Sequence, residues 1–176
     1  MAAPPTNLMT FAEFVELPET EFRQELWNGV LVNLGPSIHS GFLIQQRIRA
    51  LLSQTGGTQG EAITEFGFKP KPDFEYRIAD AAFLTKERWE SIPRDGYMAG
   101  APELVVEVLS RSNTKAEMIE KEKLCLENGR LEFWTVDIRR KTVTTSRSNG
   151  RVTVHGTGEN IPLFFGGALA VDATFS

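Results

Sequence analysis

Two apolar segments that each enclose an acidic residue constrain the fold of this chain more than any other feature. Residues 77–84 (RIADAAFL) contain Asp80, and residues 102–110 (PELVVEVLS) contain Glu107. The Leu-Val-Val run of the second segment is apolar on both faces, which is typical of a strand covered on both sides. A carboxylate in such a strand is costly unless it is paired, hydrogen-bonded or bound to a metal. The two acids therefore predict core strands that carry a polar site.

The rest of the chain predicts helices and strands in a mixed order. Helices are expected at 10–17, where Thr10 and Glu13 form a capping box, and at 37–53, 86–89 and 113–128. Further strands are expected as a hairpin at 21–33 turning at Asn28-Gly29, at 62–69, at 132–137 and as a hairpin at 141–155, with 161–171 returning to the sheet edge. This order predicts an α/β (mixed α+β) fold, with a central mixed β-sheet flanked by helices.

The length of 176 residues is enough for one domain. We expect a disordered tail at 1–9 and a single domain at 10–176. Cys125 is the only cysteine, so an internal disulfide is impossible, which favours a reducing cytoplasm. The first residues lack the pattern of a signal peptide, and no apolar run is long enough to cross a membrane. The sequence thus predicts a cytoplasmic protein without membrane association.

Lys121, on the helix predicted after the strand that contains Glu107, completes a group of residues suited to phosphodiester chemistry. Two carboxylates, Asp80 and Glu107, can hold Mg²⁺ (or Mn²⁺), and the carbonyl oxygen of Val108 can add a ligand. The ammonium group of Lys121 can orient a water or offset negative charge. Glu25, just before the first hairpin turn, can complete the acidic shell through a water or a second metal. These four side chains predict a site for phosphodiester hydrolysis.

An ordered series of short motifs carries a resemblance to a known family. The motifs are TFAEF at 10–14, ELWNGVLV at 25–32, Pro36-Ser37 with His39, ADAAF at 79–83, APELVVEVLS at 101–110, Lys121, and Gly129 with EFWTVD at 132–137. In this order they resemble the Uma-two family of restriction endonuclease-like proteins, within the PD-(D/E)xK nuclease superfamily. The resemblance runs from about Thr10 to the C-terminus, and it implies a restriction endonuclease-like core.

The resemblance also assigns residues to the nuclease motif. Asp80 matches the first acid, although Ala79 stands where the family has proline. Glu107 matches the second acid, but Leu109 occupies the position where the superfamily's lysine follows. Members of this family use a lysine displaced onto the next helix, which is Lys121 here. The resemblance thus implies Asp80, Glu107 and Lys121 as the catalytic set.

Glu25 matches the acid of the family's first motif, and Cys125 replaces a tyrosine common near the lysine. The function implied is a Mg²⁺-dependent endonuclease that hydrolyses DNA phosphodiester bonds, acting as a homodimer because double-strand cuts are usually made by symmetric pairs. One alternative is a non-catalytic nucleic-acid-binding or interaction module that retains the fold. Another is a hydrolase of small phosphoesters, which the net charge of −4 keeps open because nucleic-acid binding relies on cationic surfaces.

The site residues also have structural alternatives. Asp80 can be a satisfied structural acid bonded to Arg77 or Lys69. Glu107 and Lys121 can form a buried ion pair without catalysis. Lys121 can also be a solvated residue, because it lies in a run of mixed charges that typically marks an exposed helix face. The positions of these side chains in the fold distinguish the alternatives.

Overall fold

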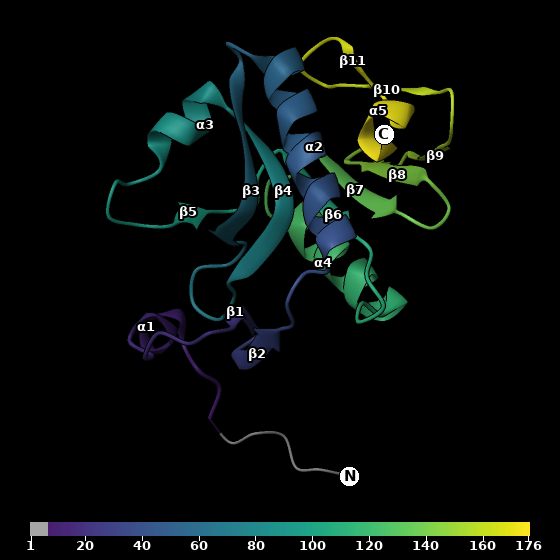
Figure 1. Ribbon diagram of the computed structural model, residues 1–176. Helices are drawn as coiled ribbons and strands as arrows, with labels where there is room; N and C mark the ends of the chain where they lie inside the picture. The colour runs from purple at the N-terminus through teal and green to yellow at the C-terminus, as the bar shows by residue number, and fades with distance from the viewer. Residues whose placement is uncertain (1–6) are drawn as a thin grey trace.

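A seven-stranded mixed sheet with the order β5-β3-β4-β6-β7-β8-β9 forms the centre of the molecule (Figure 1). The structure is a computed structural model and describes residues 7–176. The strands are β3 (Gly60–Lys69), β4 (Arg77–Thr85), β5 (Met98–Ala99), β6 (Leu104–Val108), β7 (Glu132–Asp137), β8 (Thr142–Arg147) and β9 (Val152–His155). Strands β6 and β7 are parallel, as are β3 and β5, and the other neighbours are antiparallel. The predicted mixed central sheet is confirmed.

The two long helices, α2 (His39–Gly56) and α4 (Lys115–Glu127), lie on opposite faces of the sheet (Figure 1). Ile48 of α2 packs in a core cluster that includes Val106, whereas Cys125 of α4 packs in a second cluster that includes Val105. Successive residues of a strand point to opposite faces, so the two clusters fill the two sides of β6. Both sides of β6 are thus buried, as its apolar sequence predicts.

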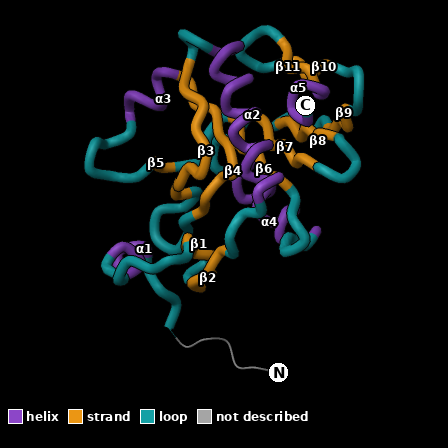
Figure 2. Tube along the Cα trace, viewed as in Figure 1, coloured by secondary structure: helices purple, strands orange, loops and turns teal. Residues whose placement is uncertain are grey.

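Two helices begin with a capping box that the local sequence provides, and Figure 2 shows where the helices lie along the chain. Helix α1 (Phe11–Val15) begins with the expected capping box between Thr10 and Glu13. Helix α4 begins with a second capping box, in which Thr114 accepts from the N–H of Glu117 and the Glu117 side chain accepts from the N–H of Thr114. The remaining helices are α3 (Lys86–Ser91) and α5 (Val171–Phe175).

The hairpin of β1 (Arg23–Trp27) and β2 (Val30–Leu34) is a separate two-stranded sheet. Its turn is the expected one, because Asn28 and Gly29 have φ angles of 46° and 80°. Leu26 docks the hairpin onto the end of β4, since its backbone exchanges two hydrogen bonds of 2.9 Å with Tyr76. This docking brings the residue before Leu26 next to the central sheet.

The C-terminal segment does not return to the edge of the central sheet, so that prediction was wrong. Strands β10 (Asn160–Pro162) and β11 (Ala168–Ala170) pair with each other in a separate two-stranded sheet. Ile161 and Leu169 are buried in the same core cluster as Ile48 of α2. The segment therefore buries its apolar residues over the face that carries α2, which an edge position beside β9 would not allow.

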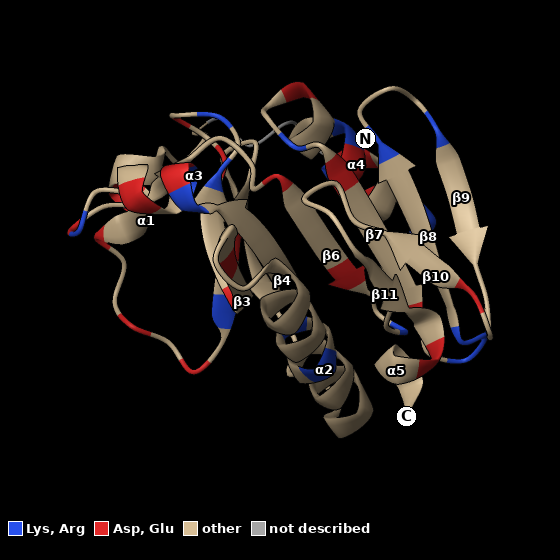
Figure 3. Ribbon diagram, turned by 90° about the horizontal axis from the view of Figure 1, so that it is seen from above, with Lys and Arg blue, Asp and Glu red and all other residues tan. Residues whose placement is uncertain are grey.

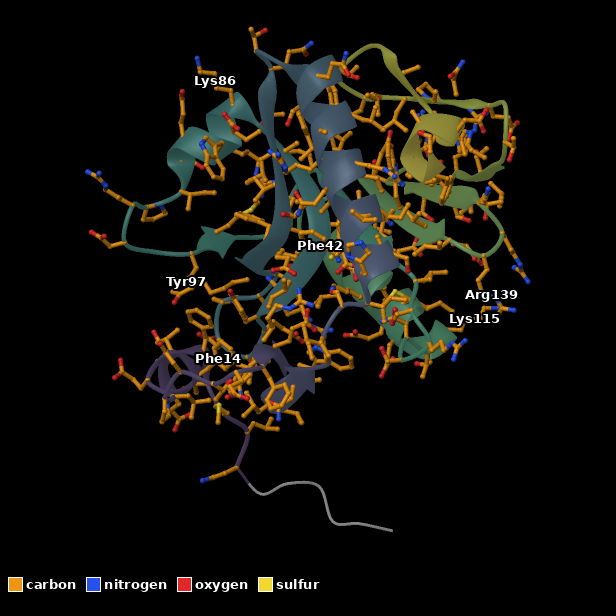
Figure 4. All side chains as sticks on the ribbon, viewed as in Figure 1. Phe14, Phe42, Lys86, Tyr97, Lys115 and Arg139 are labelled. Carbon is orange, nitrogen blue, oxygen red and sulfur yellow. The ribbon has the colours of Figure 1, made fainter. Side chains whose placement is uncertain are left out.

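Aromatic rings attach α1 to the rest of the domain. The ring of Phe14 lies 5.2 Å from that of Tyr76, which lies 5.8 Å from the ring of Tyr97. Phe14 and Tyr97 are labelled at the same end of the molecule in Figure 4.

Of the tail expected at 1–9, residues 1–6 lie outside the described part, and Met9 donates its N–H to the carbonyl of Gly29 at 2.9 Å. Among residues 7–176, the helices are too short or too polar to cross a membrane.

Candidate active site

The side chains of Glu25, Asp80, Glu107 and Lys121 line one cavity with a volume of about 450 Å³. They come from β1, β4, β6 and α4, which are distant in the sequence. The cavity lies at the carboxyl end of β6, where loop residues after β6 and the beginning of α2 complete its wall. The structure thus brings all four sequence-predicted side chains together, including Glu25 from the separate hairpin.

Lys121 lies at the centre of this group and is not a solvated helix residue. Only 5% of it is exposed, on the buried face of α4. Its Nζ lies 2.8 Å from Oε1 of Glu107 and 3.4 Å from Oε1 of Glu25, and it donates a hydrogen bond of 2.7 Å to the carbonyl of Ile78. The ammonium group therefore bridges strands β1, β4 and β6.

The orientation of Glu107 follows from the alternation of β6. Val106 and Val108 pack in the core cluster on the side of α2, so Glu107 between them points toward α4 and Lys121. The ammonium group of Lys121 is the donor close to Oε1 of Glu107, and no other donor among residues 7–176 bonds to this carboxylate. The carboxylate of Glu107 thus keeps unused acceptor capacity although only 6% of the residue is exposed.

Asp80 lies beside Glu107 because Ala81 is opposite Val106 in the antiparallel pairing of β4 with β6. Both oxygens of Asp80 accept hydrogen bonds. Oδ2 accepts from the backbone N–H of Val108 at 2.7 Å, and Oδ1 accepts from Nε2 of Gln45 at 2.9 Å. These two donors fix the plane of the carboxylate at the cavity wall.

Arg77 and Lys69, the two basic residues that could have made Asp80 a purely structural acid, bind other groups in the fold. Arg77 instead makes ion pairs of 2.9 Å with both Glu75 and Glu120. Lys69 places its Nζ 4.6 Å from the centre of the Phe11 ring. Asp80 therefore lacks the basic partners that the sequence offered as an explanation for a purely structural acid.

Glu25 is the best satisfied of the three acids. Its Oε1 accepts from the backbone N–H of Ile78 at 2.7 Å, its Oε2 accepts from Nε1 of Trp27, and Lys121 lies nearby. Three donors thus converge on one carboxylate that is 1% exposed. The geometry makes Glu25 an anchor that ties the hairpin to β4 and to Lys121, with few free lone pairs for a metal.

Burial shifts the pKa values of the group. It raises the pKa of Glu107 to about 8, since desolvation and the nearby charge of Asp80 outweigh the opposing effect of Lys121. Burial also raises the pKa of Asp80, opposed by the N–H of Val108 and the charge of Lys121. For Lys121 burial acts to lower the pKa, but the carboxylates of Glu107 and Glu25 outweigh it, and its pKa lies above the usual value. Lys121 is therefore an ammonium group at neutral pH.

The donor set fits a hard divalent cation only with help from other oxygens. Within residues 7–176, no three or more His, Cys, Asp and Glu side chains are arranged to hold a metal ion. Asp80 and Glu107 face one cavity, however, and Lys121 is the one close donor to Glu107 in the described part of the chain, which leaves the carboxylate with acceptor capacity to spare. Mg²⁺ typically binds one or two carboxylates and completes its shell with waters and substrate phosphate. The pair fits that pattern.

Gln45 is the site residue that sequence reasoning missed. The sequence places it in the helix expected at 37–53, where a polar side chain is usually exposed. In the structure it is 2% exposed, lines the cavity and contacts Asp80. Its spacing from Gly41, Ile48 and Leu52, all buried on α2, was the available signal, because i, i+4, i+7 and i+11 share one helix face.

Comparisons with known proteins identify the family and support the fold. The model of the Uma2 family, described as "putative restriction endonuclease", matches residues 11–172. The fold is similar to a crystal structure of a "putative nuclease belonging to DUF820" from Anabaena variabilis, with a TM-score of 0.81 and 20% identity over 95% of this chain and 97% of that chain. At that identity the likeness shows the fold alone. No curated protein matches the chain.

Proposed function

The chain belongs to the Uma2 family, and we propose that it is a metal-dependent endonuclease that hydrolyses the phosphodiester bonds of DNA. The observation that carries this proposal is the convergence of Asp80, Glu107 and Lys121 on one cavity. Buried acids of this kind are costly without a partner, and Lys121 alone leaves Glu107 incompletely satisfied. A cation and a phosphate supply the missing partners.

In this proposal Asp80 and Glu107 hold Mg²⁺ or Mn²⁺, and the carbonyl of Val108 adds a ligand. A bound ion would supply Lewis-acid chemistry and would lower the pKa of a water. Lys121 stays protonated, so its role is to offset negative charge that develops on the phosphate rather than to accept a proton. Loss of the proton from Glu107 accompanies cation binding, because a nearby positive charge favours the carboxylate.

Glu25 supports the site by holding Lys121 in place. Its other donors, Ile78 N–H and Trp27 Nε1, keep the carboxylate fixed when Lys121 interacts with substrate. The loop after β6 contributes to substrate binding, because the exposed Ser110 and Arg111 line the same cavity. Hydroxyl and guanidinium groups are common partners of nucleic-acid phosphates.

The direct test is metal-dependent nicking of supercoiled plasmid by purified wild type and Lys121→Met. The matched control is Lys123→Met on the same helix, because Lys123 is exposed and its ion pair is a long one, 3.9 Å to Glu127. We expect nicking with Mg²⁺ or Mn²⁺, its loss in Lys121→Met, and wild-type rates in Lys123→Met. Nicking that survives Lys121→Met would point to a contaminant or a different active site.

The proposal includes a homodimer, since two sites are needed to cut both strands at one position. Sedimentation equilibrium with and without a short duplex measures this directly. A monomer in both conditions would limit the enzyme to single-strand cuts or to two independent events.

A second candidate is hydrolysis of small phosphodiesters, which the cavity volume of about 450 Å³ and the net charge of −4 favour. It predicts turnover of a chromogenic phosphodiester by a protein that does not bind duplex DNA. A non-catalytic module retaining the fold predicts equal, negligible heats when Mn²⁺ is titrated calorimetrically into wild type and Asp80→Ala.

A further inference from the structure

The side-chain amide of Gln45, on the buried face of α2, is hydrogen-bonded through its nitrogen but, in the described part of the chain, not through its oxygen. Its Nε2 donates to Oδ1 of Asp80 at 2.9 Å, while its own Oε1 is buried without a hydrogen-bond partner among residues 7–176. The neighbouring buried positions of α2 are apolar, including Ile44 and Ile48. In the view coloured by charge, α2 is mostly uncharged, and acidic residues lie on β6 and α4 across from it (Figure 3).

The contact with Asp80 determines which way the amide of Gln45 faces. Only the NH₂ group can point at a carboxylate, so the oxygen must take the position that has no donor. A buried acceptor without a partner costs about 1–3 kcal/mol. An apolar side chain at this position would avoid that cost, so packing of α2 gives no reason for glutamine here. The contact with Asp80 is what the amide provides.

We infer that Gln45 is a positioning residue that holds Asp80 ready to bind a divalent cation. Gln45 and the N–H of Val108 each engage one oxygen of Asp80, which fixes the carboxylate and leaves the other lone pairs free. A lysine or arginine would also hold Asp80, but its positive charge would compete with the cation. A neutral amide orients Asp80 without that competition. The inference rests on the proposed metal-dependent function.

The test is calorimetric titration of Mn²⁺ into wild type and Gln45→Met, together with thermal unfolding of both in EDTA. Methionine has a similar length and helix propensity but cannot donate to Asp80. Loss of a partner that orients a metal ligand typically weakens metal binding about 10–100-fold. We expect a weakening in that range for Gln45→Met, with an unfolding temperature in EDTA equal to or above that of wild type.

The matched control is Gln46→Met, the adjacent residue of the same helix. Gln46 donates to Oγ1 of Thr64 at 3.3 Å, whereas the glutamine that donates to Asp80 is Gln45. Its Mn²⁺ affinity should equal that of wild type. A role of Gln45 in helix packing alone would lower the unfolding temperature without a selective effect on the metal.

Three outcomes overturn the inference. Equal Mn²⁺ affinities of wild type and Gln45→Met would remove the role of Gln45 while leaving the nuclease proposal intact. Equal weakening by Gln45→Met and Gln46→Met would assign the effect to the helix and not to Asp80. Absence of Mn²⁺ binding by wild type would overturn both this inference and the metal-dependent function. If Gln45→Met does not fold, Gln45→Leu is titrated in its place against the same control.

Discussion

Two buried glutamates on adjacent parallel strands illustrate the difference between a structural acid and a site acid. Glu132 begins β7 opposite Leu104, whereas Glu107 lies near the carboxyl end of β6. Glu132 accepts from Nε1 of Trp134 at 2.9 Å and pairs with Arg147 at 3.2 Å. Among residues 7–176, Glu107 has Lys121 as its one close donor, whereas Glu132 has two partners.

Burial is nearly the same for the two residues, with 2% of Glu132 and 6% of Glu107 exposed. Burial alone therefore does not identify a functional acid. The difference lies in what remains unsatisfied and in which end of the strands the residue occupies, because ligands in open α/β sheets bind beyond the carboxyl ends. Glu107 meets both conditions, and Glu132 meets neither.

The largest expected difference between the two acids is in catalysis. Glu107→Gln keeps the shape of the side chain but removes the charge that holds the cation, so plasmid nicking should fall about 100-fold or more. Glu132→Gln should stay within a few-fold of wild type. Initial nicking rates in Mn²⁺ measure both. Comparable losses in the two variants would mean that Glu107 acts through folding, as Glu132 does.

The next largest difference is in stability, and here the change at Glu132 should have the larger effect. Glu132→Leu leaves the indole N–H of Trp134 buried without an acceptor, which costs about 1–3 kcal/mol. Glu107→Leu leaves Lys121 with two partners, Glu25 and the carbonyl of Ile78, and relieves the desolvation of one acid. At pH 6 Glu107 is protonated, because its pKa is about 8, so its loss removes no charge and should cost no more than about 1 kcal/mol, the net value of one hydrogen bond. Urea denaturation in EDTA at this pH compares them, and a larger loss for Glu107→Leu would contradict the distinction.

The sequence predicts the three principal residues of the site for a physical reason. A carboxylate within an apolar strand needs a partner, so Asp80 and Glu107 are conspicuous without any knowledge of the fold. Lys121 is less evident, because its neighbours in the sequence are mixed charges and nothing local indicates that this one is buried. The family resemblance is what assigns Lys121 to the site, and in the structure its Nζ lies 2.8 Å from Glu107.

The remaining features depend on contacts that no local pattern specifies. Gln45 contacts Asp80 only because α2 crosses β4 at one particular position, and a polar helix residue is exposed by default. The anchoring of Glu25 to Ile78 depends on how the first hairpin docks onto β4. The C-terminal strands pair with each other, and Ile161 is buried in the cluster that includes Ile48 of α2. Long-range packing decides each case.

A smaller effect of Glu107 is a dependence of the free energy of unfolding on pH. Its pKa in the folded state is raised to about 8 from 4.5, so the folded protein retains a proton that the unfolded chain loses. The stability from this proton is complete below about pH 4.5 and is lost as the pH rises through 8. Glu107→Gln lacks this loss. The difference in free energy of unfolding, variant minus wild type, should therefore grow between pH 5 and 8 in EDTA. A difference that stays constant or shrinks over this range would show that the pKa is not raised.

The smallest expected effect is the reactivity of Cys125, one turn beyond Lys121 on α4. Cys125 is fully buried in the core cluster with Phe133, and burial raises its pKa to about 12. The thiolate is the reactive form, so a thiol reagent at pH 8 should modify the wild type only through unfolding. Labelling should then be faster in Glu132→Leu than in Glu107→Leu, because the first variant opens more often. The guanidinium-unfolded chain, which should label at once, is the control. Native labelling that is equally rapid in all three proteins would mean that Cys125 is reached without unfolding, and that the side of the sheet covered by α4 is less tightly packed than the contacts of Glu132 imply.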